Sequence, residues 1–124
     1  NKENYNGESL FNEKYYKPWG SLCGHVQFFK TSSYIEAGME NEEFISYGAE
    51  DRERMNRFIR FGYDVQWLDR QVYHIEHSRG PNSSVHNPKY HANEALYERL
   101  NSMETEDMIN YYKNVNYLKK YAKS

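Results

Sequence analysis

The chain has 124 residues, a formal net charge of −2 and a single cysteine, which suits one domain or part of one. The near-neutral charge excludes a strong long-range attraction to nucleic acid or to an anionic membrane surface. With only Cys23 present, an internal disulfide is excluded, and nothing in the composition requires an oxidising compartment.

A thin, aromatic core is expected. Val, Ile, Leu and Phe make up about 18% of the chain, under the roughly 20% level below which disorder is suspected. The low net charge and the 13 Tyr and 2 Trp residues favour a folded chain, because these rings supply other surface to bury. The first residue is Asn rather than Met, and we expect the chain to be a fragment of a longer protein. Its thin core would then pack against the other half of that protein. No apolar run approaches the roughly 18 residues of a membrane span.

The N-terminal part predicts a polar lead-in, one strand and one short helix. Residues 1–18 are polar and show no clear period, which predicts a loop or tail. Trp19 after them is either a substrate-facing aromatic, because sugars stack on flat indole faces, or a rim aromatic that covers the core. Cys23–Phe29 is rich in β-formers and predicts a strand. Ser33 and Glu36 have capping-box spacing, which predicts a helix that ends at Gly38.

A second predicted helix carries two adjacent acids in its first turn. The acidic run 40–43 before it predicts a solvated loop, or alternatively part of a mobile lid. Met55, Phe58 and Ile59 recur at i, i+3 and i+4 and form one apolar stripe, and Gly62 stands at the C-terminal cap. The plain interpretation of Glu50 and Asp51 is that they complement the helix dipole, worth about 0.3–1 kcal/mol each.

Two further strands are predicted after this helix, over 63–68 and 71–76, joined by a hairpin-like turn. Alternation along the second strand places His74 and Glu76 on one face and His77 on the other. Both histidines reach one metal only if the chain bends near Glu76. His77 is therefore the better single ligand, because it stands where the strand gives way to a loop. The plain alternative for each is a hydrogen-bonded, partly buried histidine.

The C-terminal third predicts two helices. Asn87 and Pro88 mark the start of the first, as cap and first helical residue. Its expected buried stripe is Ala92, Ala95, Leu96, Leu100 and Met103. Thr105 is the expected cap of the last helix, whose apolar side is Met108, Tyr112, Val115, Leu118 and Ala122. The whole pattern is α/β with more helix than strand.

Two stretches resemble one region of known enzymes. The first runs from Gly24 through the short helix to Tyr47-Gly48-Ala49-Glu50-Asp51, and the second is Tyr73–Arg79 with Asn82 and Asn87-Pro88 after it. In this order and spacing they resemble the acceptor-side half of the β-1,4-galactosyltransferases and the related polypeptide N-acetylgalactosaminyltransferases. The resemblance covers about residues 20–90. It implies that the chain is the C-terminal part of a glycosyltransferase with a partial GT-A fold.

The resemblance also implies roles for particular residues. Asp51 would be the general base of an inverting transfer from a UDP-sugar, and Glu50 would orient the donor sugar or the acceptor. Gly48 would let the backbone approach the sugar, which Tyr47 would cover. The other substrate-binding candidates are Trp19 and Arg79. His77, with His74 beside it, would hold a catalytic Mn²⁺ or Mg²⁺, a role for which neutral imidazole is suited.

Two departures from the family pattern leave a rival open. The relatives carry an Asp-x-Asp motif in an earlier nucleotide-binding half, and none occurs in these 124 residues, so we expect the fragment alone to be inactive. The relatives also usually carry Trp where this chain has Tyr47. The rival is a non-catalytic module that binds a glycan or a protein, and the surplus of aromatic residues and the missing Asp-x-Asp motif support it, whereas the change at Tyr47 bears on which substrate is bound. For the enzyme, we expect a bacterial role in surface or capsular polysaccharide synthesis, in the cytoplasm or at the periphery of the inner membrane.

Overall fold

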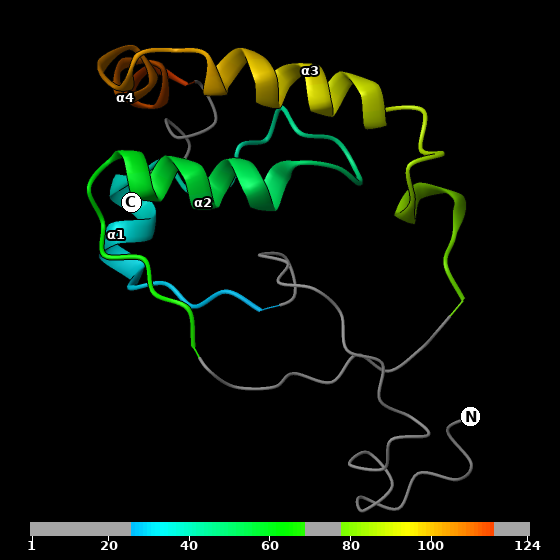
Figure 1. Cartoon of the computed structure of the whole chain (residues 1–124), viewed down its shortest axis with the longest axis horizontal. Coiled ribbons are helices and arrows are strands. Elements are labelled where there is room, and N and C mark those ends of the chain that lie inside the picture. Colours follow the sequence, from blue (N-terminus) through cyan, green and yellow to red (C-terminus); the bar gives the residue numbers. More distant parts are fainter. Residues whose placement is uncertain (1–25, 69–77, 116–124) are drawn as a thin grey trace, which may run out of the picture.

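The computed structural model describes residues 26–68 and 78–115. They form the helices α1 (Thr31–Glu36), α2 (Glu50–Arg60), η3 (Pro81–Ser83, a 3-10 helix), α3 (Tyr90–Asn101) and α4 (Thr105–Asn114). The helices α2 and α3 pack side by side, begin at the same end and run in the same direction (Figure 1). The 3-10 helix η3 lies at the end where both begin, and α4 lies near the end where α3 finishes (Figure 1).

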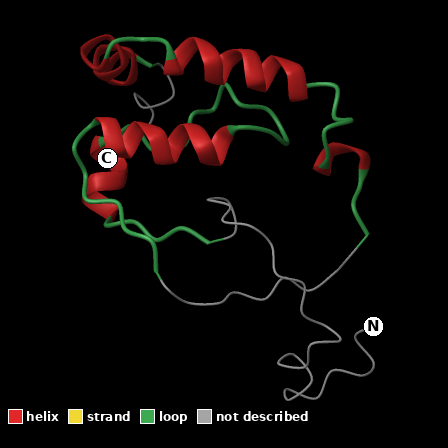
Figure 2. Ribbon diagram, viewed as in Figure 1, coloured by secondary structure: helices red, strands yellow, loops and turns green. Residues whose placement is uncertain are grey.

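The described part of the chain contains no strand (Figure 2). The described parts of the predicted strands, residues 26–29 and 63–68, are neither helix nor strand. The rest of the predicted strands, residues 23–25 and 71–76, lies outside the described residues, as does the lead-in 1–18. The α/β fold class and the partial GT-A architecture therefore remain predictions. None of the described helices is long and apolar enough to cross a membrane.

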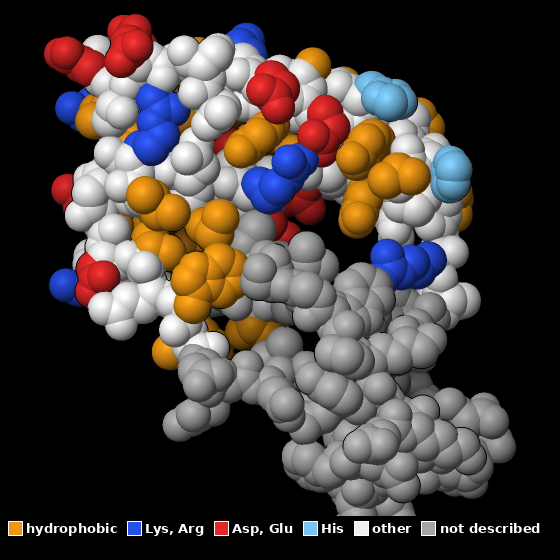
Figure 3. Space-filling view, viewed as in Figure 1, with side chains coloured by type: hydrophobic (Ala, Val, Ile, Leu, Met, Phe, Trp, Pro, Cys, Tyr) orange, Lys and Arg blue, Asp and Glu red, His pale blue; other side chains and the backbone are white. Residues whose placement is uncertain are grey.

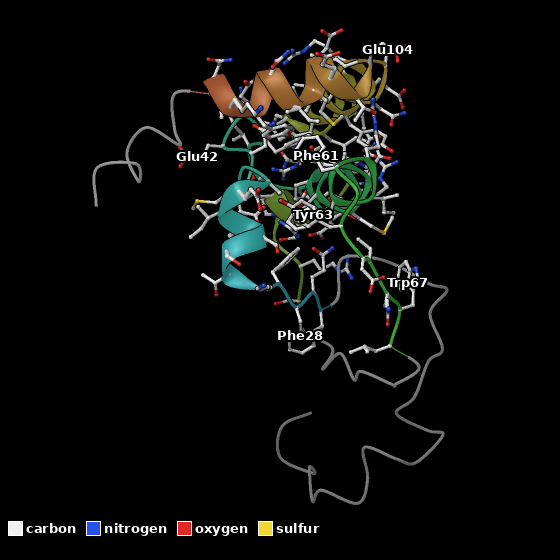
Figure 4. All side chains as sticks on the ribbon, turned by 90° about the vertical axis from the view of Figure 1, so that its left-hand side faces the viewer. Phe28, Glu42, Phe61, Tyr63, Trp67 and Glu104 are labelled. Atoms are coloured by element: carbon white, nitrogen blue, oxygen red, sulfur yellow. The ribbon has the colours of Figure 1, made fainter. Side chains whose placement is uncertain are left out.

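The apolar core lies where α3 and α4 meet. Leu100, Met108 and Tyr112 are at most 2% exposed, and partly buried side chains surround them: Phe44, Phe61, Leu96, Met103 and Tyr111. Figure 4 shows Phe61 among the helices, whereas Phe28 and Trp67 lie on the segments outside them, 81% and 64% exposed. The predicted stripes of the last two helices are thus confirmed in part, because Ala92 and Ala95 on α3 are exposed. Leu118 and Ala122 of the last predicted stripe lie outside the described residues.

The buried face of α2 is largely polar. Phe58 of the predicted stripe is 6% exposed, but Ile59 is 53% exposed. Glu53, Arg54 and Arg57 are buried instead. The apolar stripe predicted for this helix is therefore wrong at Ile59. The reason is that α2 faces loop backbone, which offers carbonyl groups to its arginines rather than apolar surface.

Arg57 is the centre of a buried polar network. Its side chain is fully buried and donates from Nη1 to Ala37 O and from Nη2 to Met39 O, both at 2.7 Å. Its Nε lies 3.1 Å from Glu53 Oε1, an ion pair without hydrogen-bond geometry, and its guanidinium stands 4.1 Å from the centre of the Tyr112 ring. The network ties the loop after α1 to α2 and α4.

Tyr112 and Glu53 complete the network. The Tyr112 hydroxyl donates to Glu53 Oε1 at 2.6 Å and accepts from Asn41 Nδ2 at 2.9 Å. Burial raises the pKa of the Glu53 carboxyl, although the charge of Arg57 acts in the opposite direction. Burial also raises the pKa of the Tyr112 phenol, and the neighbouring Glu53 carboxylate adds to the effect. The phenol thus remains a hydrogen-bond donor, which is what the carboxylate requires.

The acidic run 40–43 makes specific contacts. Glu40 accepts from the Tyr34 hydroxyl at 2.8 Å and pairs with Arg54. Glu43 accepts from the Tyr111 hydroxyl at 2.5 Å, and burial together with this bond raises the pKa of Tyr111 to about 12. The prediction of a solvated loop is confirmed for the three acids, which are exposed, although helix side chains contact Glu40 and Glu43 and although Asn41 is buried.

The predicted helix ends are correct to within a few residues, except that α4 ends at Asn114 and Val115 is extended, whereas the predicted last helix runs on to Ala122. Gly62, at φ +84°, follows α2, with its N–H bonded to Ile59 O and the next N–H bonded to Phe58 O, the pattern of a glycine C-cap. The capping box predicted for α1 does not form, because Ser33 lies inside the helix and Lys30 is the cap. The helix α3 begins at Tyr90, two residues after Pro88, where its start was predicted. Thr105 is the first residue of α4 rather than its cap.

Replacing Arg57 by Met will test the buried network. The variant keeps most of the side-chain volume but removes the buried charge that pairs with the Glu53 carboxylate and the donors to two loop carbonyls. We expect a loss of about 3–5 kcal/mol in the free energy of unfolding, measured by urea denaturation. Arg52→Met is the matched control on the same helix, because its pair with Glu94 is solvent-exposed and should be worth under about 1 kcal/mol. If both variants lost the same amount of unfolding free energy, Arg57 would not be the centre of a stabilising network.

Candidate functional site

A strained turn leads into α2. We call residues 46–49 the Gly48 turn. Ser46, Gly48 and Ala49 all have positive φ, at +66°, +128° and +64°. Non-glycine residues rarely adopt this region, and such strain tends to collect at functional sites, where the surrounding structure enforces it. The Gly48 turn therefore needs contacts from outside itself to persist.

Glycine is required at position 48. A Cβ at this position would lie 3.0 Å from Tyr90 Cδ2 and 3.3 Å from Tyr90 Cε2, in addition to the unfavourable φ. The ring of Tyr90 on α3 also stacks near Tyr47, with centroids 6.2 Å apart and planes at 22°. Tyr47 remains 39% exposed. The backbone of the turn therefore lies directly against α3, while Tyr47 presents one aromatic surface outward.

The two adjacent acids at the start of α2 have different partners. Glu50 Oε2 accepts from Gly48 N–H at 2.9 Å and so closes the turn that precedes it. Asp51 pairs with Arg54, three residues further along the helix. The Asp51 side chain remains 33% exposed in this pair, so one carboxylate supports the turn and the other is available to solvent at the N-terminal end of the helix.

Arg54 connects Asp51 to the loop after α1. It is 8% exposed, pairs with both Asp51 and Glu40, and donates from Nε to Gln27 Oε1 at 2.7 Å. Its guanidinium also lies 5.6 Å from the centre of the Phe29 ring. This arginine was not predicted as part of the site, although its i+3 spacing from Asp51 is visible in the sequence.

The segment around η3 reaches the Gly48 turn. The Ser46 hydroxyl donates to Asn82 O at 3.0 Å, and Asn87, 3% exposed, donates from Nδ2 to the same carbonyl at 3.4 Å. The structure thus brings together the ends of the two stretches on which the family resemblance rests. Arg79, a predicted substrate-binding residue, is exposed on the approach to η3.

The remaining predicted site residues cannot be placed. Trp19, His74 and His77 lie outside the described residues, so their roles remain predictions. The described histidines, His86 and His91, are exposed (Figure 3). Within 26–68 and 78–115, no three or more His, Cys, Asp or Glu side chains are grouped so that they could hold a metal ion.

Asn93 is a second residue of the site, besides Arg54, that sequence reasoning missed. It lies on α3 and is 2% exposed, with its side chain bonded to the backbone of Ile45 and Tyr47. Its position between Ala92 and Glu94 gave no signal for this contact, because its partners lie more than forty residues earlier.

One family model matches the chain. This family is described as the N-terminal domain of galactosyltransferase, and its model matches residues 8–78. The match includes the Gly48 turn and the whole of α2. No curated protein and no solved structure matches the chain.

Substituting Gly48 by Ala will test how tightly the turn is constrained. We expect a larger loss of unfolding free energy than for Gly62→Ala. Both glycines have positive φ, which costs about 1–2 kcal/mol for a residue with a side chain, but only Gly48 faces another residue, since nothing lies within 4 Å of a Cβ at Gly62. Urea denaturation measures both variants. Equal losses would show that Tyr90 does not restrict the turn.

Proposed function

The chain belongs to the family described as the N-terminal domain of galactosyltransferase, and we propose that it is the acceptor-side part of an inverting glycosyltransferase. The family supports a glycosyltransferase-like role and the binding of a sugar donor and acceptor. The finer proposal is transfer of a hexose or N-acetylhexosamine from a UDP-sugar to a glycan. The β-1,4-galactosyltransferases and polypeptide N-acetylgalactosaminyltransferases are the proposed nearest families, and the C-terminal position of this part within the enzyme is likewise a proposal.

The observation that carries the proposal is the Gly48 turn. A strained backbone, a buried glycine and a half-exposed tyrosine stand directly before two acids at a helix start. Such a turn presents its carboxylates in a fixed direction, which is what positioning a substrate requires. An ordinary helix start needs only a cap and an acid to complement the dipole, so the dipole interpretation does not account for the strain.

In the proposed reaction Asp51 is the general base. Its carboxylate takes the proton of the acceptor hydroxyl as that oxygen bonds to C1 of the donor sugar, and the bond from C1 to the diphosphate oxygen breaks with its electron pair leaving on UDP. Arg54 keeps the Asp51 side chain oriented. Glu50, held by the turn, stands beside the sugar. Attack from the face opposite the leaving group accounts for inversion.

Further residues are proposed to contact the substrates or the metal. Tyr47, with its exposed aromatic surface, would cover a sugar, and Gly48 would let the backbone approach it. Arg79 would meet phosphate oxygens, for which a guanidinium is suited, and Trp19 would stack on a sugar. His77, with His74 beside it, is the proposed holder of Mn²⁺ or Mg²⁺, whose chemistry is neutralisation of the departing diphosphate.

The biological setting is also a proposal. The absence of an internal disulfide and the near-neutral charge are compatible with a bacterial enzyme of surface or capsular polysaccharide synthesis, working in the cytoplasm or at the inner membrane. The rival is a non-catalytic glycan-binding module. Two observations favour it: the Asp51 carboxylate is already paired, and the 124 residues lack an Asp-x-Asp motif.

Asp51→Asn in the full-length protein separates these two functions. With UDP-galactose or UDP-N-acetylgalactosamine and MnCl₂, we expect turnover to fall by about 10²–10⁴-fold, the usual contribution of a general base. UDP binding, measured by calorimetry, should change by less than about twofold, because Asp51 is not among the proposed contacts to UDP.

Asp107→Asn is the control, since it changes an exposed acid in the first turn of α4. It should leave turnover and UDP binding as they are in the wild type. Wild-type turnover in the Asp51 variant would remove Asp51 from the mechanism. A wild-type protein that binds glycan but turns over neither donor would favour the rival.

A further inference from the structure

Asn93 is a buried polar residue on a helix face that should be apolar. It lies three residues before Leu96 and seven before Leu100, and so on the same side of α3 as the core. It is 2% exposed. A leucine here would have extended the apolar stripe, whereas a buried amide is costly unless its donors and acceptor are all satisfied.

Its hydrogen bonds all go to one short stretch of backbone. Oδ1 accepts from Ile45 N–H at 3.1 Å, and Nδ2 donates to Ile45 O at 2.9 Å and to Tyr47 O at 3.1 Å. The amide thus pairs with both backbone groups of Ile45, as a neighbouring strand would. These hydrogen bonds offset the cost of burying the amide. The side chain therefore fixes this stretch of backbone and does not serve as part of the apolar core.

That stretch leads directly into the Gly48 turn. The strain of Ser46, Gly48 and Ala49 requires support on both sides. On the helix side, Glu50 accepts from Gly48 N–H. On the loop side, Asn93 holds Ile45 and Tyr47. The Ser46 hydroxyl also donates to Asn82 O, but this bond is exposed.

We propose that Asn93 is a positioning residue for sugar transfer. It fixes the direction in which the chain enters α2, and thereby where Tyr47, Glu50 and Asp51 stand relative to the donor and acceptor. This inference rests on the proposed function. Asn93 touches no reacting atom and acts through the turn. Without its bonds the strained backbone relaxes, and a shift of about 1 Å in a catalytic group can cost about 10²-fold in rate.

The test replaces the amide by an apolar side chain with the same branching and the same number of heavy atoms. Asn93→Leu in the full-length protein removes all three bonds and leaves an apolar residue on an apolar stripe. With UDP-galactose and MnCl₂ we expect kcat to fall about 10–100-fold, while KM for UDP-galactose changes by less than about threefold. Asn93→Ala, which avoids any overpacking by leucine, should show the same split between kcat and KM.

Amide exchange supplies a readout that does not depend on turnover. The Ile45 N–H is bonded to Asn93 Oδ1, so we expect its exchange to accelerate by roughly 10-fold or more in both Asn93 variants, while Leu100 and Met108 amides keep their protection. Asn56→Ala is the control, because Asn56 also joins α2 to α3, through Asn101 Oδ1 at 2.8 Å, but far from the turn. It should alter neither kcat nor Ile45 exchange.

The outcomes separate the two proposals. Wild-type kcat in both Asn93 variants, or a kcat loss equal to that of Asn56→Ala, overturns the positioning role. If the wild-type protein turns over no donor, the proposed function fails. Amide exchange of Ile45 then tests only whether Asn93 holds the backbone before the Gly48 turn. In that case, unchanged Ile45 exchange in the Asn93 variants shows that Asn93 does not fix the turn.

Discussion

The structure depends on a fully buried arginine. Arg57 places its guanidinium between the carbonyls of Ala37 and Met39, the Glu53 carboxylate and the Tyr112 ring. Removing a charge from water is costly unless it is paired and hydrogen-bonded, so these contacts must form together. Because they come from α2, α4 and the loop after α1, the arrangement of the three segments is set by this one side chain.

Two buried side chains therefore replace regular structure between α1 and α2. Arg57 binds the backbone at 37–39, and Asn93 binds it at 45–47. Buried backbone groups need partners, and here helix side chains supply them where a strand or helix ladder would otherwise do so. As a result, the entry of the chain into α2 is fixed by long-range contacts. The direction of Glu50 and Asp51, and any function that depends on it, follows from them.

The sequence predicted the features that are local. The glycine cap at Gly62 and the buried Leu100 follow from turn chemistry and from helical period, which act over a few residues. The buried face of α2 was missed because Glu53 and Arg57 read as solvent-facing in any hydropathy pattern. Asn93 was missed for a related reason, since nothing around it shows that its partners lie more than forty residues earlier. The position of Asp51 was predicted, but its orientation by Arg54 was not.

The central claim is that the stretch held by Asn93 and closed by Glu50 faces the sugar nucleotide. Amide hydrogen exchange of the full-length protein, with and without UDP-galactose and MnCl₂, measures this most directly. We expect slower exchange over residues 44–51 when the ligand is bound and unchanged exchange in α4. Ligand binding shown by calorimetry, together with unchanged exchange over 44–51, would contradict the account.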